Sequence, residues 1–252
     1  NLVILMVHGM FGGDWYFESW AKFLQDIGFQ VYVLNLRGHN GSFCLKLGSV
    51  SIMDYVSDVK KVADYIYKKY SIPPVMIAHS MGGLIAQKMT EVYPYLVKGL
   101  VLVASAPPKG ISVLSFLVLR KIIKHMLKIV FNKSFNMTRK DCFSLVLNNF
   151  NKDDTEANLV AKKFMSTPES GKAAKELALS LIPVDHRKIN CKTLIVAGSK
   201  DKICPLNIQW EIKEKYYFSD YFQFERGHML MLEPGWEKVI SKISDWISMN
   251  IF

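Results

Sequence analysis

Short continuous runs of Val, Ile, Leu and Met alternate along the chain with longer segments whose apolar residues recur at helical spacing. The runs, typical of parallel strands buried on both faces, are residues 2–7, 29–34, 75–78, 97–104, 193–197 and 221–224. The helical patterns are residues 15–27, 52–70, 81–93, 206–216 and 236–246. This alternation predicts an α/β fold with a doubly wound, mostly parallel sheet, whose functional sites lie at the carboxyl ends of the strands.

The alternation is interrupted once. From residue 107 to about residue 190 there are helical patterns and loops but no convincing strand. We interpret residues 107–190 as an inserted helical cap, and residues 1–106 and 191–252 as one core domain. At 252 residues the chain has the length of one large domain with such an insertion.

One strand ends abruptly in small residues around a serine. The run 75–78 is followed by His79 and Ser80, and helical spacing resumes directly afterwards. A serine at such a strained bend has its hydroxyl lifted clear of the sheet, and the residues two before and two after it must be small because strand and helix nearly collide. Those residues are Ala78 and Gly82. Since a small-x-Ser-x-Gly turn also occurs by chance, the interpretation needs partner residues.

Two other predicted strand ends supply partners. Asp201 lies in the loop after the strand 193–197, and His228 lies in the segment after the strand 221–224. A serine hydroxyl is a weak nucleophile at neutral pH, so an imidazole must take its proton, and a buried carboxylate must orient that imidazole. Ser80, His228 and Asp201 therefore form a candidate nucleophile, base and acid.

Several other polar residues have simpler interpretations. Asp185 and Asp220 are rival acids, but neither follows a strand in a G-x-x-D loop. We expect His79 to be a packed residue rather than a second base, and Asp14 to cap the helix that begins at residue 15. The residues expected to tie loops together near the site are His8, Arg37 and His39.

Five segments together resemble the α/β-hydrolase family of serine esterases and lipases, including monoacylglycerol lipases: His8-Gly9, Arg37-Gly-His39, Ala78-His-Ser-Met-Gly-Gly83, the 198–205 loop and Gly227-His228. The resemblance covers nearly the whole chain. It implies an acyl-enzyme mechanism without metal or organic cofactor, and an oxyanion hole made by the backbone N–H groups of Met10 and Met81.

The chain also departs from this family in places. Asn35 and Asn40 stand where relatives usually have Asp and Gly, and the first residues after the strand 97–104, Ser-Ala-Pro, lack the carboxylate that some members carry there. Many relatives have two more strands before the first one found here. The chain is either a minimal version or trimmed at its N-terminus, and the missing initiator Met leaves an unrecorded leader open.

The composition bears on where the protein is found and on whether it binds a metal ion. Hydrophobic residues make up 50% of the chain, yet no uncharged apolar run approaches the roughly 18 residues that a membrane span needs. No export signal is visible. The four cysteines are scattered, which suits reduced thiols in the cytoplasm, and the six histidines lack metal-binding spacing.

The net charge of +10 is concentrated in the insertion. Residues 109–140 hold eight basic residues and no acidic one, against 24 basic and 22 acidic residues elsewhere. Lys121, Lys124 and Lys128 share one helical face, which favours either a solvated outer face over an acyl pocket or weak association with anionic lipid. Nucleic acid is disfavoured, because the basic residues interleave with aliphatic side chains.

These features predict a serine carboxylic-ester hydrolase acting on medium-to-long-chain acyl esters such as monoacylglycerols or lysophospholipids. Phe116 and Leu117 are expected to line the acyl pocket. Thioester hydrolysis, carbon–carbon bond hydrolysis, acyl transfer and cofactor-free perhydrolysis remain alternatives on the same triad. A non-catalytic binding protein is the alternative from another class.

Overall fold

The computed structural model describes residues 2–111 and 125–251. Within these ranges the strands are β1 (Val3–Val7), β2 (Gln30–Leu34), β3 (Val75–His79), β4 (Gly99–Val103), β5 (Lys192–Gly198) and β6 (Ser219–Phe224). They form one sheet in the order β2-β1-β3-β4-β5-β6, and all neighbouring strands are parallel. Each apolar run thus forms a strand, and the prediction of a doubly wound parallel sheet is confirmed.

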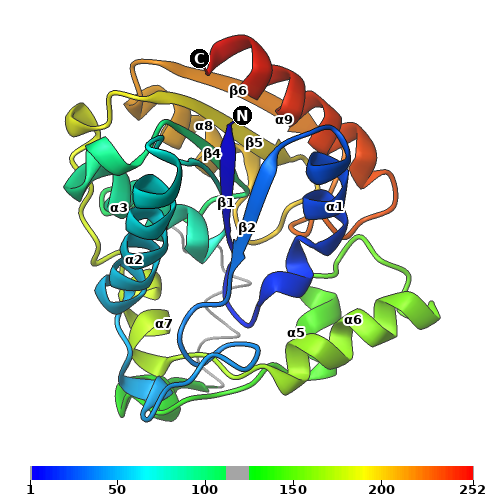
Figure 1. The fold of residues 1–252 in the computed structure, drawn as a ribbon. Helices are drawn as coiled ribbons and strands as arrows, with labels where there is room; N and C mark the ends of the chain where they lie inside the picture. The colour runs from blue at the N-terminus through cyan, green and yellow to red at the C-terminus, as the bar shows by residue number, and fades with distance from the viewer. Residues whose placement is uncertain (1, 112–124, 252) are drawn as a thin grey trace.

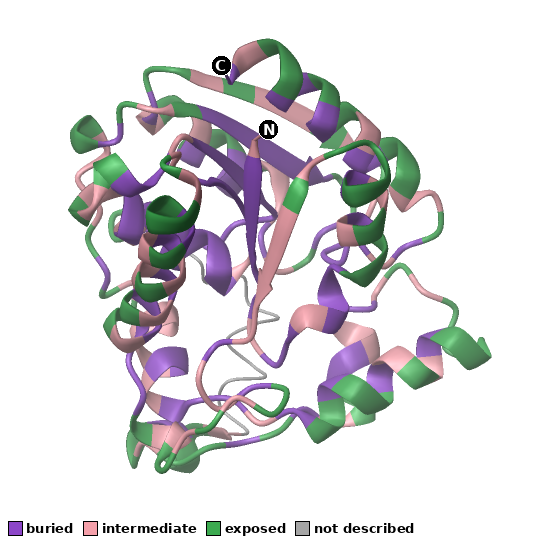
Figure 2. Ribbon diagram, viewed as in Figure 1, coloured by how far each residue is buried: buried purple, intermediate pink, exposed green. Residues whose placement is uncertain are grey.

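Helices cover both faces of the sheet (Figure 1). One face carries α1 (Glu18–Asp26) and α9 (Trp236–Asn250), and the other carries α2 (Ile52–Tyr70), α3 (Met81–Val92) and α8 (Leu206–Lys215). Alternate residues of β1 divide between the two apolar layers, since Ile4 packs with α1 and α9 and Leu5 with α2 and α3. Figure 2 shows the central strands buried between these layers.

Helix α2 has the bounds that the sequence predicts. The hydroxyl of Ser51 accepts the backbone N–H of Asp54, and the Asp54 carboxylate accepts the N–H of Ser51, so a capping box starts the helix. Ser71, at φ 58°, ends it in the left-handed region. Between these caps an apolar stripe is buried against the sheet.

The start of α1 differs from the prediction. A 3-10 turn, Asp14–Tyr16, comes first, and the α-helix begins only at Glu18 with Phe17 as its N-cap. The side chain of Asp14 does not cap a helix, so that prediction is wrong. Its two carboxylate oxygens instead accept the side-chain amides of Asn35 and Asn40, which ties the loop after β2 to this turn.

The segment between β4 and β5 is helical where it is described. It contains α5 (Arg139–Ser144), α6 (Thr155–Ser166), α7 (Gly171–Ala178) and a helical stretch at residues 125–130. Within 107–111 and 125–190 the structure has no strand, only a bridge between Phe135 and Glu169. Figure 1 shows these helices beyond the carboxyl ends of the strands, where the predicted site lies. Four residues of the predicted cap face and pocket wall, Phe116, Leu117, Lys121 and Lys124, lie outside the described residues.

Candidate active site

Ser80 lies at the sharp turn between β3 and α3. Its backbone has φ 53° and ψ −121°, a conformation that a residue with a side chain adopts only under strain. The Ser80 carbonyl accepts N–H groups from Gly83 and Ala106, and its N–H donates to Val103. A Cβ on Gly82 would meet the carbonyl oxygens of Val7 and His8 at 2.5 Å, so only glycine fits there. The predicted strained serine turn is therefore present.

His228 and Asp201 lie beside Ser80 although their loops are far apart in sequence. Nε2 of His228 is 3.1 Å from Oγ of Ser80, and Nδ1 of His228 is 2.8 Å from Oδ2 of Asp201. The other oxygen of Asp201 accepts the backbone N–H groups of Ile203 at 2.7 Å and Cys204 at 3.0 Å. The Asp201 carboxylate is buried and hydrogen-bonded on both oxygens, which fixes the imidazole orientation.

Two buried residues hold the loop that carries His228. Nε2–H of His79 donates to the carbonyl of His228 at 2.9 Å, and the Glu233 carboxylate accepts the N–H of Gly227 at 2.8 Å. Burial, followed by the nearby His228, holds the pKa of His79 well below its ordinary value, so the ring is neutral. His79 is a packed, loop-holding residue, as the sequence predicts. Glu233 was missed, because its role depends on a turn that no short motif marks.

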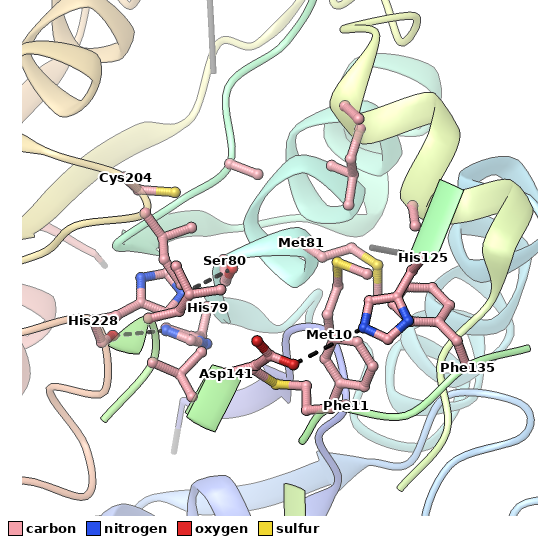
Figure 3. A pocket seen from close by; sticks show the side chains of 18 of the residues that line it. Met10, Phe11, His79, Ser80, Met81, His125, Phe135, Asp141, Cys204 and His228 are labelled. Atoms are coloured by element: carbon pink, nitrogen blue, oxygen red, sulfur yellow. Dashed lines mark hydrogen bonds and ion pairs between the residues drawn. The ribbon is translucent and has the colours of Figure 1, made fainter. Parts of the chain in front are cut away.

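Met10 and Met81 line the same cavity as Ser80 (Figure 3). Met81 is the first residue of α3, where backbone N–H groups are not used by the helix itself. The carbonyl of Met10 accepts the hydroxyl of Tyr16 at 2.7 Å, so the Met10 backbone is held in place. The structure thus brings both predicted oxyanion residues to the serine.

The cavity wall away from the serine is mostly apolar. The larger apolar side chains that the segment between β4 and β5 contributes are Ile129, Phe135, Met137, Leu145, Val146 and Leu177. A polar pair, His125 and Asp141, also lines it, with Nε2 of His125 4.0 Å from Oδ2 of Asp141 (Figure 3). A polar catalytic edge with an apolar opposite wall suits a ligand that has one reactive polar group and an apolar tail.

The remaining candidates lie elsewhere or serve the scaffold. Asp185 pairs with Arg187 at the surface, and this arginine lowers the pKa of Asp185 to about 2. Asp220 accepts the indole N–H of Trp246 at 2.7 Å. The rival acids are therefore both engaged outside the site.

The loop-tying residues behave as predicted. Arg37 binds Asp58 through its side chain, with Nη2 2.6 Å from Oδ1. His8 accepts the backbone N–H of Leu36, and His39 binds Glu169 at 3.1 Å. The last contact was not predicted, because Glu169 belongs to the segment between β4 and β5 and no local spacing links it to His39.

Within residues 2–111 and 125–251, no three His, Cys, Asp or Glu side chains are grouped so that they could hold a metal ion. The same residues contain no helix long and apolar enough to cross a bilayer.

In this parallel sheet, a serine on a strained strand-to-helix turn is hydrogen-bonded to a histidine, and that histidine is hydrogen-bonded to an aspartate. The histidine and the aspartate follow two later strands, and this arrangement defines the class of α/β-fold serine hydrolases. Comparison with known families gives the same class. A family model described as serine aminopeptidase, S33, matches residues 1–220, so the chain belongs to this family of α/β hydrolases, among enzymes of the esterase and lipase type.

Individual relatives are more distant. A pimeloyl-[acyl-carrier protein] methyl ester esterase of Wigglesworthia glossinidia brevipalpis is 25% identical over 196 residues, which cover 76% of this chain and 72% of that protein. A protein of Saccharomyces cerevisiae named as a probable alcohol acetyltransferase is 31% identical over 105 residues, 41% of this chain and 30% of its own length. The solved structure of a thermophilic esterase from Thermogutta terrifontis superposes with a TM-score of 0.78 at 19% identity, covering 100% of this chain and 91% of that one. That likeness concerns the fold.

Proposed function

We propose that the protein is a serine carboxylic-ester hydrolase that works through an acyl-enzyme. The observation that carries this proposal is the continuous hydrogen-bonded chain from Ser80 through His228 to Asp201. Ser80 attacks the ester carbonyl carbon while His228 takes the hydroxyl proton, and His228 then protonates the departing alcohol. Water, activated by the same histidine, releases the acid from Ser80.

The developing negative charge needs fixed donors. The backbone N–H groups of Met10 and Met81 are proposed to bind the oxyanion, and Asp201 balances the imidazolium that forms on His228. Thioesterase, carbon–carbon hydrolase, acyltransferase and perhydrolase activities use the same groups. Acyl transfer is the alternative with a specific observation in its favour, namely the partial match to the yeast protein. A non-catalytic binder is disfavoured because such proteins tend to lose a member of the triad, whereas Ser80, His228 and Asp201 are hydrogen-bonded in one chain.

Replacement of the serine tests the proposal. We expect Ser80→Ala to lower ester hydrolysis by roughly three to six orders of magnitude while the far-UV spectrum is unchanged. A fluorophosphonate probe should label the natural protein and not the variant. Ser248→Ala, which removes a hydroxyl bonded to Ser244 in α9, is the matched control and should keep full activity. Retained hydrolysis in Ser80→Ala would disprove the mechanism.

The apolar wall supports a medium-to-long acyl chain as substrate, with residues 107–190 acting as a cap over the core made by residues 1–106 and 191–252. We expect activity on 4-nitrophenyl esters to peak above butyrate. Val146 lines the cavity, so Val146→Phe should shift the optimum to shorter chains, whereas Val92→Phe, at an exposed end of α3, should not. A maximum at acetyl esters in the natural protein would overturn the proposed acyl pocket.

An interfacial role is the further element of this proposal. Leu127 and Phe131 are 74% and 67% exposed, and the neighbouring Lys128 and Lys133 are exposed as well. Exposed apolar side chains beside lysines suit a surface that adsorbs weakly to anionic lipid. We expect salt-sensitive binding to phosphatidylglycerol vesicles, which Leu127→Ser with Phe131→Ser should reduce and Tyr217→Ser, 92% exposed elsewhere, should not. No binding at low salt would exclude this role.

A further inference from the structure

One buried carboxylate collects four hydrogen bonds beside the site. Glu169, in the segment between β4 and β5, has no exposed surface. Its Oε2 is 3.1 Å from the backbone N of Phe11 and 3.1 Å from Nε2 of His39. Its Oε1 accepts the hydroxyl of Tyr55 at 2.9 Å and the N–H of Ser170 at 2.7 Å. Each carboxylate oxygen thus faces two donor groups, and three of the four partners, Phe11, His39 and Tyr55, lie in segments far away in sequence.

The balancing charge comes from His39. Its Nδ1 faces the carbonyl of Arg37 at 3.2 Å and its Nε2 faces Glu169, so both ring nitrogens face acceptors. Only the imidazolium can donate from both. Burial alone would lower the pKa of His39, but the charge of Glu169 and the hydrogen bonds raise it above its ordinary value. His39 and Glu169 therefore form a buried ion pair. Removing one partner of such a pair strongly destabilises the folded protein, because it leaves the other charge buried and unpaired.

The backbone held by this carboxylate is strained. Phe11 has φ 57°, in the left-handed region that is unfavourable for an aromatic residue. Strained residues persist when the surrounding contacts over-determine them. Here the peptide unit between Met10 and Phe11 is fixed at both ends, because Tyr16 donates its hydroxyl to the Met10 carbonyl at 2.7 Å and Glu169 accepts the Phe11 N–H.

We propose that Glu169 and Tyr16 are positioning residues for the oxyanion site: they clamp the Met10–Phe11 peptide and so aim the N–H of Met10 at the substrate carbonyl oxygen. This inference rests on the proposed function. The clamp also links that site to the pocket wall, since the backbone of Glu169 exchanges two hydrogen bonds with Phe135, which lines the cavity.

A pair of ketones separates oxyanion binding from ordinary binding. Oγ of Ser80 adds to the carbonyl carbon of a trifluoromethyl ketone. The serine proton passes to His228, and the carbonyl oxygen of the ketone becomes an oxyanion. A methyl ketone with the same alkyl chain does not form this adduct appreciably, so its inhibition constant reports the ground state. The ratio of the two inhibition constants therefore measures stabilisation of the oxyanion.

Tyr16→Phe tests one end of the clamp with little change of shape. We expect the ketone ratio and kcat each to fall about 10- to 100-fold, with KM and the methyl ketone constant nearly unchanged. Tyr216→Phe is the matched control, because it also removes one buried hydroxyl. That hydroxyl donates to the side chain of Gln87 at 2.7 Å, and Tyr216 does not line the cavity. This control should leave the ratio unchanged.

Glu169→Ala tests the other end, with Glu176→Ala as control. Glu176 lies in the same segment and accepts the backbone N–H of Ile52 at 2.7 Å, so it reports general docking of that segment. Only Glu169→Ala should lower the ketone ratio; if it does not fold, Tyr16→Phe decides. An unchanged ratio in folded Tyr16→Phe or Glu169→Ala would overturn the clamp. A natural protein that forms no trifluoromethyl ketone adduct would instead overturn the proposed function.

Discussion

At the scale of single residues, the contacts of Asp201 suit its proposed role, which is to orient His228 and to balance the imidazolium that forms there. One of its oxygens meets His228 and the other meets two backbone N–H groups. These hydrogen bonds hold the carboxylate in one orientation beside the imidazole. An amide at this position keeps the shape but carries no charge, and it changes which nitrogen of His228 bears the proton.

We expect Asp201→Asn to lower kcat by about 10³- to 10⁴-fold. The reason is that the imidazole then presents the wrong tautomer to Ser80. Asp185→Asn and Asp220→Asn are matched controls, because each acid is engaged with another partner outside the cavity. Steady-state kinetics of the three variants decide the assignment. A nearly silent Asp201→Asn would show that the acid is another residue.

The residues of the triad could be predicted because each comes at or shortly after the end of a strand, in a short segment whose composition is distinctive. Glu169 could not be predicted in this way. Its partners Phe11 and Tyr55 are 158 and 114 positions away in sequence. A glutamate in a helical segment usually lies at the solvated surface. Its burial depends on how the segment between β4 and β5 folds back on the core, which sequence periodicity does not encode.

At the scale of elements, the site depends on the close approach of α3 to the end of β1. Gly82, in the first turn of α3, lies against the carbonyl oxygens of Val7 and His8. The glycine lets the helix start directly above the sheet, which places Ser80 at the strand end. The position of the serine is therefore set by helix–strand packing as well as by its own backbone.

A methyl group at this contact should displace the helix. We expect Gly82→Ala to destabilise the fold by about 1–3 kcal/mol and to lower kcat about 10-fold or more. Gly28→Ala is the control: its φ of 98° also strains an alanine, but a Cβ there meets nothing within 4 Å. Urea denaturation should show both variants weakened, and kinetics on the folded proteins should show only Gly82→Ala impaired. Full activity in Gly82→Ala would show that the close approach is unimportant.

How well elements could be predicted varied with how local their signals are. Helix α2 combines a capping box with a long apolar stripe, and both of its ends were predicted correctly. The start of α1 was misjudged because Trp15 and Tyr16 are buried in a 3-10 turn, whose aromatic residues resemble a first helical turn in sequence. In the segment between β4 and β5 the sequence indicated helices, but their packing onto the core follows from tertiary contacts such as Glu176 with Ile52.

At the scale of the whole molecule, the interior holds histidines in two charge states. His8 and His79 are fully buried and neutral. Burial, and then the neighbouring His39, lowers the pKa of His8 to about 3; burial, and then His228, lowers that of His79 well below 6.5. His39, whose ring centroid lies 5.1 Å from that of His8, is instead charged and paired with Glu169. The unfolded chain titrates all of them near their ordinary value of 6.5.

This distribution predicts how stability depends on pH. Below pH 6.5 the unfolded chain binds protons on His8 and His79 that the folded protein does not bind, so stability falls with falling pH. The slope should be about 1.4 kcal/mol per pH unit for each of the two, between about pH 5 and 6. His39 acts oppositely: its raised pKa adds stability that is complete below 6.5 and is lost as the pH rises through the folded value.

We therefore expect the free energy of unfolding to fall as the pH decreases below 6.5, and to fall again as the pH rises through the raised pKa of His39. Keeping measurements above about pH 5 excludes most carboxylates, whose ordinary pKa values are lower. Urea denaturation across this range measures the slope. His8→Gln keeps an acceptor near the position of Nε2, the atom that accepts the N–H of Leu36, so it should fold and remove about one proton from the acid-side slope. An acid-side slope that is flat in the natural protein, or unchanged in His8→Gln, would mean that these histidines are charged in the folded state.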